Sequence, residues 1–174
     1  ATIGSHPFDL KMVEDGVEWF GATCQKTITV TAAPQPDLIT NHQEITITGA
    51  LTTGTILTFT STVKNQGNGS AVTGSICRWC IDNTNCYTST TGRINEHSFG
   101  AFDPNMISNP RTSNGWTATA GSHAIWWCAD VTNVVTNESN ESNNCHSRQF
   151  TVSVPPPVCG NGILESGEAC DNGG

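Results

Sequence analysis

The run Ile56-Leu57-Thr58-Phe59-Thr60-Ser61-Thr62-Val63 alternates between two kinds of position. In an extended backbone Leu57, Phe59 and Val63 fall on one face, while threonines occupy most of the other face. Threonine and aromatic residues also favour strands because they fit a pleated, half-buried surface. The run therefore predicts a β-strand over residues 56–63, with one face in a core and the other in solvent.

Similar short runs occur along the rest of the chain. They predict further strands at residues 27–30, 45–48, 75–81, 117–120, 123–131 and 149–154. Glycine, asparagine and proline separate these runs, and a long helical periodicity is absent. Short strands with turn residues between them predict an all-β fold, an Ig-like antiparallel β-sandwich.

Two proline clusters divide the chain. The first lies at residues 32–36 and the second at residues 155–157, and both predict short, stiff polyproline-type linkers. We therefore expect three parts: residues 1–33, a sandwich over residues 34–154, and a linker with a tail over residues 155–174.

A pattern near the N-terminus recurs at the end of the predicted sandwich. Its order is Gly-Ser-His, an alternating run, a polar stretch, a cysteine, a second alternating run and a proline cluster. It starts at Gly4 and again at Gly121. We interpret residues 1–33 as the closing hairpin of a preceding or neighbouring Ig-like domain, with its linker. Coincidence between two threonine-rich hairpins is the alternative.

A lone two-stranded hairpin is marginal in water, so this segment is expected to pack on something. One option is an earlier domain of a longer chain, and the other is a partner copy whose sheet it completes. One of two adjacent tryptophans on a strand points away from the core, and such aromatics are common at interfaces. The interface candidates are Ile28, Val30, Trp126, Trp127 and Trp19.

Composition restricts the class of protein. Seven Lys and Arg stand against fifteen Asp and Glu, which gives a net charge of −8. Such a surface argues against nucleic-acid binding, which needs a basic footprint. No apolar run reaches the length of a membrane span. The chain has no initiator methionine, and we interpret it as a mature or partial piece of a longer exported protein.

Eight cysteines predict up to four disulfides in an oxidising, extracellular compartment. A turn-rich stretch favours a Cys80–Cys86 bridge, and Cys159 and Cys170 bracket the tail. Cys77 and Cys128 fall on two predicted core strands, which leaves Cys24 and Cys145 to join the hairpin to the sandwich or to another copy. Zinc is a weaker alternative, because only one Cys-x-x-Cys half-site is present.

The central block carries a set of short matches to a known family. They are Pro36-Asp37-Leu38, Gly54 before the run at 56–59, residues 62–69, Gly121-Ser122-His123, Ala129-Asp130 and residues 140–144. In this order they resemble the CARDB family, adhesion-related Ig-like domains of secreted prokaryotic proteins. The resemblance implies a tandem stalk or adhesion module without catalytic residues. Five cysteines inside the block depart from typical members.

The tail at residues 159–171 looks like the Cys-Gly-Asn-Gly…Gly-Glu-x-Cys-Asp repeat of secreted bacterial proteins. Its oxygen-bearing side chains suit Ca²⁺, with a solvated acidic tail as the alternative. The candidate ligands are Asn161, Glu165, Glu168 and Asp171. Asp130, Glu138 and Glu141 are expected to be solvated loop residues. Asn-x-Ser sequons make Asn68, Asn137 and Asn140 glycosylation candidates.

No arrangement of the five histidines matches a catalytic triad or a zinc protease motif, and no enzyme is predicted. We expect a structural protein at the cell surface of a prokaryote: a repeat of a filament, stalk or adhesive fibre, assembled by strand complementation, disulfides or both. Its partners would be copies of itself or neighbouring domains. An alternative is a module of a larger secreted protein that binds a glycan or surface ligand through its tryptophans.

Overall fold

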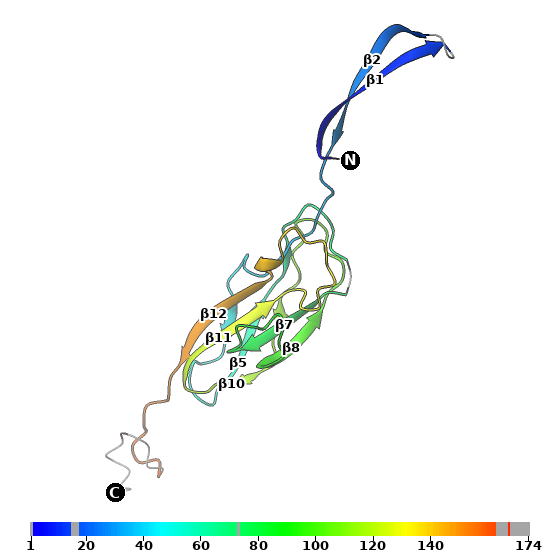
Figure 1. The fold of residues 1–174 in the computed structure, drawn as a ribbon. Coiled ribbons are helices and arrows are strands. Elements are labelled where there is room, and N and C mark those ends of the chain that lie inside the picture. Colours follow the sequence, from blue (N-terminus) through cyan, green and yellow to red (C-terminus); the bar gives the residue numbers. More distant parts are fainter. Residues whose placement is uncertain (1, 15–17, 73, 163–166, 168–174) are drawn as a thin grey trace. The chain divides into compact units, whose positions relative to one another are not determined.

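The computed structural model describes residues 2–14, 18–72, 74–162 and 167 (Figure 1). Backbone contacts divide the chain into two compact units, residues 1–34 and residues 35–174. In the described residues the strands are joined by loops, and the helix found there is a single 3₁₀ turn, η1 (Glu141–Asn143). None of the described helical segments is long and apolar enough to cross a membrane.

The first unit is a two-stranded antiparallel hairpin of β1 (Gly4–Glu14) and β2 (Glu18–Val30). β2 is longer than the run predicted at residues 27–30. The pairing is regular from Gly4 opposite Val30 to Leu10 opposite Cys24, and a bulge then shifts the register. Gly21, with a φ of +80°, lies in the bulged part of β2, where glycine accepts this backbone conformation without strain.

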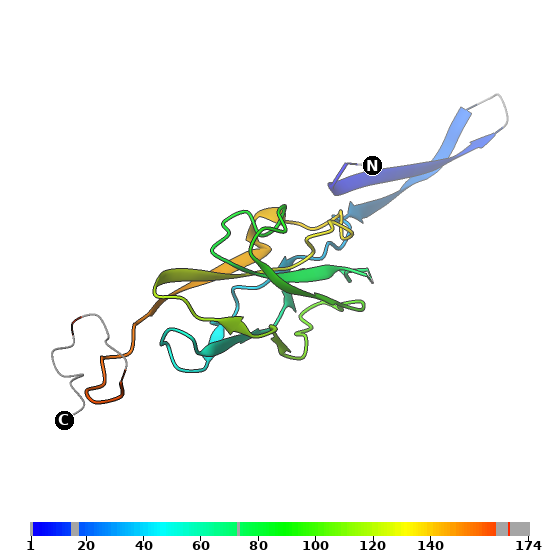
Figure 2. The same cartoon turned by 90° about the horizontal axis from the view of Figure 1, so that it is seen from below.

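The second unit contains a four-stranded antiparallel sheet in the order β12-β11-β7-β8. These strands are β7 (Ile76–Ile81), β8 (Arg93–Ser98), β11 (Gly121–Cys128) and β12 (Cys145–Val152). Both views show β11 and β12 running side by side (Figures 1 and 2). β8 was not predicted, because its sequence Arg-Ile-Asn-Glu-His-Ser is polar and has little alternation.

The opposing layer is built around β5 (Ile56–Ser61), which pairs with β4 (Thr46–Thr48), β9 (Arg111–Thr112) and β10 (Trp116–Thr117). β5 ends before the predicted residue 63. Beyond it the backbone of Val63 pairs with Ser108, and β6 (Lys64–Asn65) pairs with β3 (Leu38–Ile39). The all-β, Ig-like antiparallel sandwich is confirmed, with one predicted strand divided between two pairings.

The core lies between these layers. Leu57 and Phe59 from β5 face Trp79 and Trp127 from the four-stranded sheet, and all four side chains are fully buried. The two tryptophan rings are stacked with centroids 4.4 Å apart. Trp127 also donates its indole N–H to the carbonyl of Thr62 at 3.1 Å, which satisfies its buried polar atom.

Candidate functional site

One face of the β1–β2 hairpin is apolar and exposed. Residues opposite each other in an antiparallel pair point to the same face, and so do residues two positions apart on one strand. Ile28 is opposite His6, so it shares a face with Phe8 and Leu10. Phe8, Leu10 and Ile28 are 48%, 56% and 48% exposed. We call this side of the regular part of the hairpin the apolar hairpin face, and its apolar and aromatic members are His6, Phe8, Leu10, Ile28 and Val30.

The other face of the hairpin is mainly polar: Ser5, Pro7, Asp9, Gln25, Thr27 and Thr29. An alternation of this kind is typical of a sheet with one face on a core and one in water. Within the described residues, however, β1 and β2 pair only with each other and no buried residue lies on either strand. The hairpin therefore carries the sequence of a half-buried sheet without the layer that would cover it.

Cys24 and Lys26 lie on the same side of the hairpin as the apolar hairpin face, opposite Leu10 and Phe8. Cys24 is a free, exposed cysteine. The predicted bridge from Cys24 to Cys145 is wrong, because Cys145 is bonded to Cys128. Ile28 and Val30 lie on the apolar hairpin face, whereas the side chain of Trp19 lies outside the described part of the chain.

A second candidate feature is a group of carboxylates beside the start of β3: Asp37, Asp130, Glu138 and Glu141. We call it the acidic loop cluster. Asp37 accepts hydrogen bonds from the side chains of Gln66, Ser139 and Asn143 at 2.9, 3.2 and 2.9 Å. These bonds tie β3 to two loops distant in sequence.

The prediction that Asp130 and Glu138 are solvated is wrong. Asp130 is fully buried and Glu138 is 9% exposed. The loop after β11 folds back, so that Asp130 accepts from the backbone N–H of Val135 at 2.8 Å and Glu138 accepts from that of Leu38 at 2.8 Å. Glu141 remains exposed, as expected.

Burial, together with the charges of Glu141, Asp130 and Asp37, raises the pKa of Glu138 to about 7, although the hydrogen bond from the Leu38 N–H acts to lower it. Carboxylate oxygens of Glu138, Asp130 and Asp37 already accept hydrogen bonds from backbone N–H groups and from the Asn143 amide. Among the described residues, no group of three or more His, Cys, Asp or Glu side chains is arranged to hold a metal ion. The cluster acts as an internal brace that joins loops to β3.

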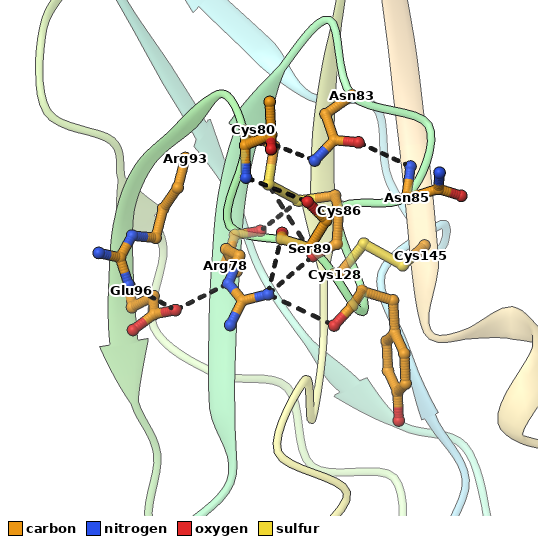
Figure 3. Close-up of a disulfide and its surroundings, with 12 residues drawn as sticks. Arg78, Cys80, Asn83, Asn85, Cys86, Ser89, Arg93, Glu96, Cys128 and Cys145 are labelled. Atoms are coloured by element: carbon orange, nitrogen blue, oxygen red, sulfur yellow. Dashed lines mark hydrogen bonds and ion pairs between the residues drawn. A yellow bond between two sulfur atoms is a disulfide. The ribbon is translucent and has the colours of Figure 1, made fainter.

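Figure 3 shows the surroundings of the disulfide between Cys80 and Cys86. Arg78 lies beside it, donates from Nε to Glu96 at 2.7 Å and donates from Nη1 to the carbonyl of Cys86 at 3.0 Å and that of Ser89 at 3.2 Å. The hydrogen bond from Arg78 lowers the pKa of Glu96. This guanidinium therefore holds the loop between β7 and β8 together with the disulfide.

The second disulfide joins Cys128 and Cys145, directly opposite each other on β11 and β12 with Cα atoms 4.1 Å apart. The predicted Cys77–Cys128 bridge is wrong. Cys77 is a free thiol that is fully buried in the core. Cys128 and Cys77 point to different sides of the sheet, since Cys128 packs with Cys80 and Cys86 rather than in the main cluster.

The four tryptophans of the sandwich, Trp79, Trp116, Trp126 and Trp127, do not form an exposed platform. Trp79 and Trp127 lie in the core, so the interface assignment of Trp127 is wrong. Trp126 is half-buried against the disulfide cluster, because neighbouring residues on β11 point to opposite faces. Trp116 packs edge-on against Phe150 with centroids 6.0 Å apart. These indoles serve packing in the sandwich.

One histidine has a carboxylate partner. His123 Nδ1 lies 2.7 Å from Asp82 Oδ2, and His123 Nε2 lies 2.8 Å from the carbonyl of Thr119. Burial lowers the pKa of His123, but the bonds to Asp82 and Thr119 outweigh it, so the pKa is raised. The carbonyl of Thr119 can only accept, so Nε2 donates to it and has no lone pair to take a proton from the nearby Thr119 hydroxyl. The arrangement is a structural clasp.

The remaining candidates are on loops and the tail. Asn68, Asn137 and Asn140 are exposed, and the side-chain oxygen of Asn140 caps η1 by accepting from the Ser142 N–H at 3.0 Å. Cys159 is disulfide-bonded and Asn161 is exposed. Glu165, Glu168, Cys170 and Asp171 lie outside the described residues, so the predicted tail disulfide and Ca²⁺ site stay predictions.

Residues 35–148 match the model of the CARDB family. A crystal structure of a CARDB domain from Pyrococcus furiosus in complex with di-metal ions is 23% identical, with a TM-score of 0.52, and covers 71% of this chain and 99% of that chain. A solution structure of a Pyrococcus furiosus CARDB domain is 23% identical with a TM-score of 0.53, covering 70% and 98%.

A domain of a Methanosarcina acetivorans protein whose name refers to the cell surface is 24% identical with a TM-score of 0.47, and covers 68% of this chain and 92% of that chain. At these identities the similarity concerns the fold. No curated protein sequence matches the chain significantly.

Proposed function

Because this chain belongs to the CARDB family, we propose that it is a non-enzymatic module of an extracellular stalk or adhesive fibre on a prokaryotic cell. In this role the sandwich of residues 35–154 is a spacer, and neighbouring modules are joined through the hairpin and the proline linkers. The observation that carries the proposal is the apolar hairpin face. An exposed apolar surface in the unit that precedes a CARDB sandwich is suited to joining one module to another.

The disulfides support an extracellular location. Cys80–Cys86 and Cys128–Cys145 pack in one cluster on the four-stranded sheet, separate from the main core, and such bonds persist in oxidising compartments. They brace the loops that follow β7 and β11. A mechanical spacer benefits from this arrangement, because a disulfide keeps a loop closed when the rest of a domain is pulled.

The contacts of the tryptophans do not favour the glycan-binding alternative. A stacking platform needs exposed aromatic faces, whereas Trp79 and Trp127 stack on each other in the core. The acidic loop cluster is likewise occupied by internal hydrogen bonds. The described residues thus offer the hairpin, rather than a glycan groove, as the surface for assembly.

The experiment is labelling of intact cells of the source organism with a membrane-impermeant amine reagent, followed by mass spectrometry of surface peptides. Lys11, Lys26 and Lys64 provide the amines. We expect labelled peptides from this chain, released by protease shaving of intact cells, with both disulfides intact before reduction. Recovery only from lysed cells, with all cysteines reduced, would contradict the proposal. A cytosolic protein of similar abundance is the control for lysis.

A further inference from the structure

We propose that the apolar hairpin face closes a second CARDB sandwich, in which β1 and β2 occupy the place that β11 and β12 hold in residues 35–154. The partner is an open sandwich of the same family, consisting of strands equivalent to β3 through β10 and lacking its own last two strands. This rests on the proposed role of the hairpin as a joint and deepens it, since it names the partner of the apolar hairpin face. The register and contacts of the hairpin are the added observations.

The two hairpins have the same register. Seven consecutive pairs run from Gly4 opposite Val30 to Leu10 opposite Cys24. Seven consecutive pairs likewise run from Gly121 opposite Val152 to Trp127 opposite His146. A shift of one residue would move every side chain to the other face. The equal register therefore places matching residues on matching faces.

The matching residues have the same chemical character. Phe8 and Leu10 stand where Ile125 and Trp127 stand, and Ile28 and Val30 stand where Phe150 and Val152 stand. In the sandwich these four positions are 0%, 0%, 8% and 2% exposed. Phe8, Leu10 and Ile28 are about half exposed in the hairpin. The sandwich shows what covers such a face: the layer formed by β5 and its neighbours.

A side-chain contact is also repeated. His6 Nε2 lies 2.7 Å from the carbonyl of Thr2, and His123 Nε2 lies 2.8 Å from the carbonyl of Thr119, four residues earlier in both cases. The sequence Ala-Thr-x-Gly-Ser-His leads into both strands, at residues 1–6 and 118–123, and its last three residues are the first of β1 and of β11. Gly4 and Gly121 have φ angles of +136° and +124°. The entry into the first strand is thus built twice in the same way.

The cation on the face is matched as well. Lys26 stands at the position of Arg148, which donates from Nη1 to the carbonyl of Ile45 in the loop that leads into β4. A lysine at this position can reach a corresponding carbonyl with its ammonium group. In the hairpin Lys26 has no such partner among the described hydrogen bonds, since the segment corresponding to Ile45 is not part of that unit.

The outer edge of β1 points to the same partner. β11 lies between β12 and β7, and residues Ile125–Cys128 pair with Arg78–Ile81 of β7. β1 pairs with β2 alone in the described structure, so its other edge offers unpaired N–H and C=O groups. A strand equivalent to β7 would satisfy these groups while the opposing layer covers the apolar face.

A second copy of this chain does not fit this role, because its sandwich already contains β11 and β12 in the place that the hairpin would take. The two hairpins also differ at the far end. Lys11 stands at the position of Cys128, and Cys24 stands at that of His146, so the second sandwich lacks the disulfide found here. In the second sandwich Cys24 would lie on the inward side of the sheet, opposite Leu10.

The test is an extended chain in which a copy of residues 34–117 is joined directly before Ala1 of the full chain. The junction preserves the spacing from β10 to Gly-Ser-His. The readouts are hydrogen–deuterium exchange of β1 and β2 amides and the rate at which a thiol reagent modifies Cys24. We expect exchange and modification to slow by about 100-fold or more relative to the 174-residue chain, as expected for groups in a cooperatively folded sandwich.

Matched substitutions locate the effect. Leu10→Asp, on the apolar hairpin face, is expected to abolish the protection, whereas Thr27→Asp, on the polar face, is expected to retain it. The extended chain with Leu10→Trp carries at this position the residue type of Trp127. It shows whether a lack of protection in the extended chain results only from loose packing around Leu10. Exchange that stays fast in both the extended chain and its Leu10→Trp version would overturn the proposal.

A dimer of the 174-residue chain with a protected hairpin would also overturn it, since a second copy would then be the occupant. Residues 35–154 are an internal control for folding in every variant. The outcome is independent of the surface-labelling experiment: an exposed hairpin leaves the cellular location untouched, and an intracellular location leaves the closure of the sandwich untouched.

Discussion

At the residue scale, Glu138 shows how a loop carboxylate becomes part of the interior. Its side chain is 9% exposed and accepts the Leu38 N–H, while burial raises its pKa to about 7. An unfolded glutamate titrates near 4.3. The native state therefore binds the extra proton between these values, and this group makes the protein less stable as pH rises from about 4.3 to 7.

We predict that Glu138→Gln removes this pH dependence. The variant should be close to wild type at pH 4 and more stable than wild type at pH 8, by at most about 4 kcal/mol. Urea unfolding monitored by tryptophan fluorescence at several pH values measures the difference. Glu141→Gln, at an exposed site, is the control and should change the curve much less. Parallel stability curves for wild type and Glu138→Gln would contradict the assignment.

The two free thiols are expected to behave differently. Cys77 is fully buried and burial raises the pKa of its thiol, whereas Cys24 is exposed. A thiolate is the reactive form, so Cys24 should be alkylated in the native chain and Cys77 only after unfolding. Peptide mapping after a timed iodoacetamide pulse measures both, with Cys24→Ser as the control. Equal labelling of both in native conditions would argue against this packing.

At the element scale, the alternating runs predicted β5, β7, β11 and β12 because a half-buried strand leaves a period of two in the sequence. β8 lacked that period and was missed. The bond from Cys128 to Cys145 was also missed, since their register depends on how a 16-residue connection closes, which no local pattern encodes. The burial of Asp130 and Glu138 was missed for the same reason, because it depends on how the loop after β11 folds back.

The disulfides are expected to differ in their contribution to stability. The Cys128–Cys145 bond spans 17 residues and the Cys80–Cys86 bond spans 6. Loop-closure entropy predicts losses of about 3 and about 2 kcal/mol when each pair is replaced by alanine. Calorimetry should therefore show the larger fall in Tm, roughly 10 °C, for Cys128→Ala/Cys145→Ala. A larger fall for the shorter bridge would show that side-chain packing, rather than loop length, dominates.

At the scale of the whole molecule, the proposed role as a spacer can be tested by mechanical unfolding of the sandwich. Its two disulfides shorten the extensible chain by 17 and 6 residues when residues 35–152 unfold. Single-molecule pulling between residues 35 and 152 should give a contour length about 80 Å longer after reduction than before it. Equal lengths in both conditions would show that these bonds are not formed in the folded protein.

The CARDB resemblance and the recurrence of the N-terminal pattern were both visible in the sequence, but only the register and contacts showed how far the recurrence extends. Residues 4–10 and 24–30 repeat the pairing of β11 and β12, while the bulge beyond Leu10 breaks it. The bulge was not predictable, because one glycine in an alternating run signals several backbone conformations.

Closure of a second sandwich by the hairpin is tested most directly by hydrogen exchange on native material shaved from the surface of the source organism, compared with the recombinant 174-residue chain. If the hairpin closes a second sandwich, β1 and β2 are protected as strongly as β11 and β12 in the native material and exchange rapidly in the recombinant chain. Rapid exchange of β1 and β2 in both samples, with β11 and β12 protected, would contradict it.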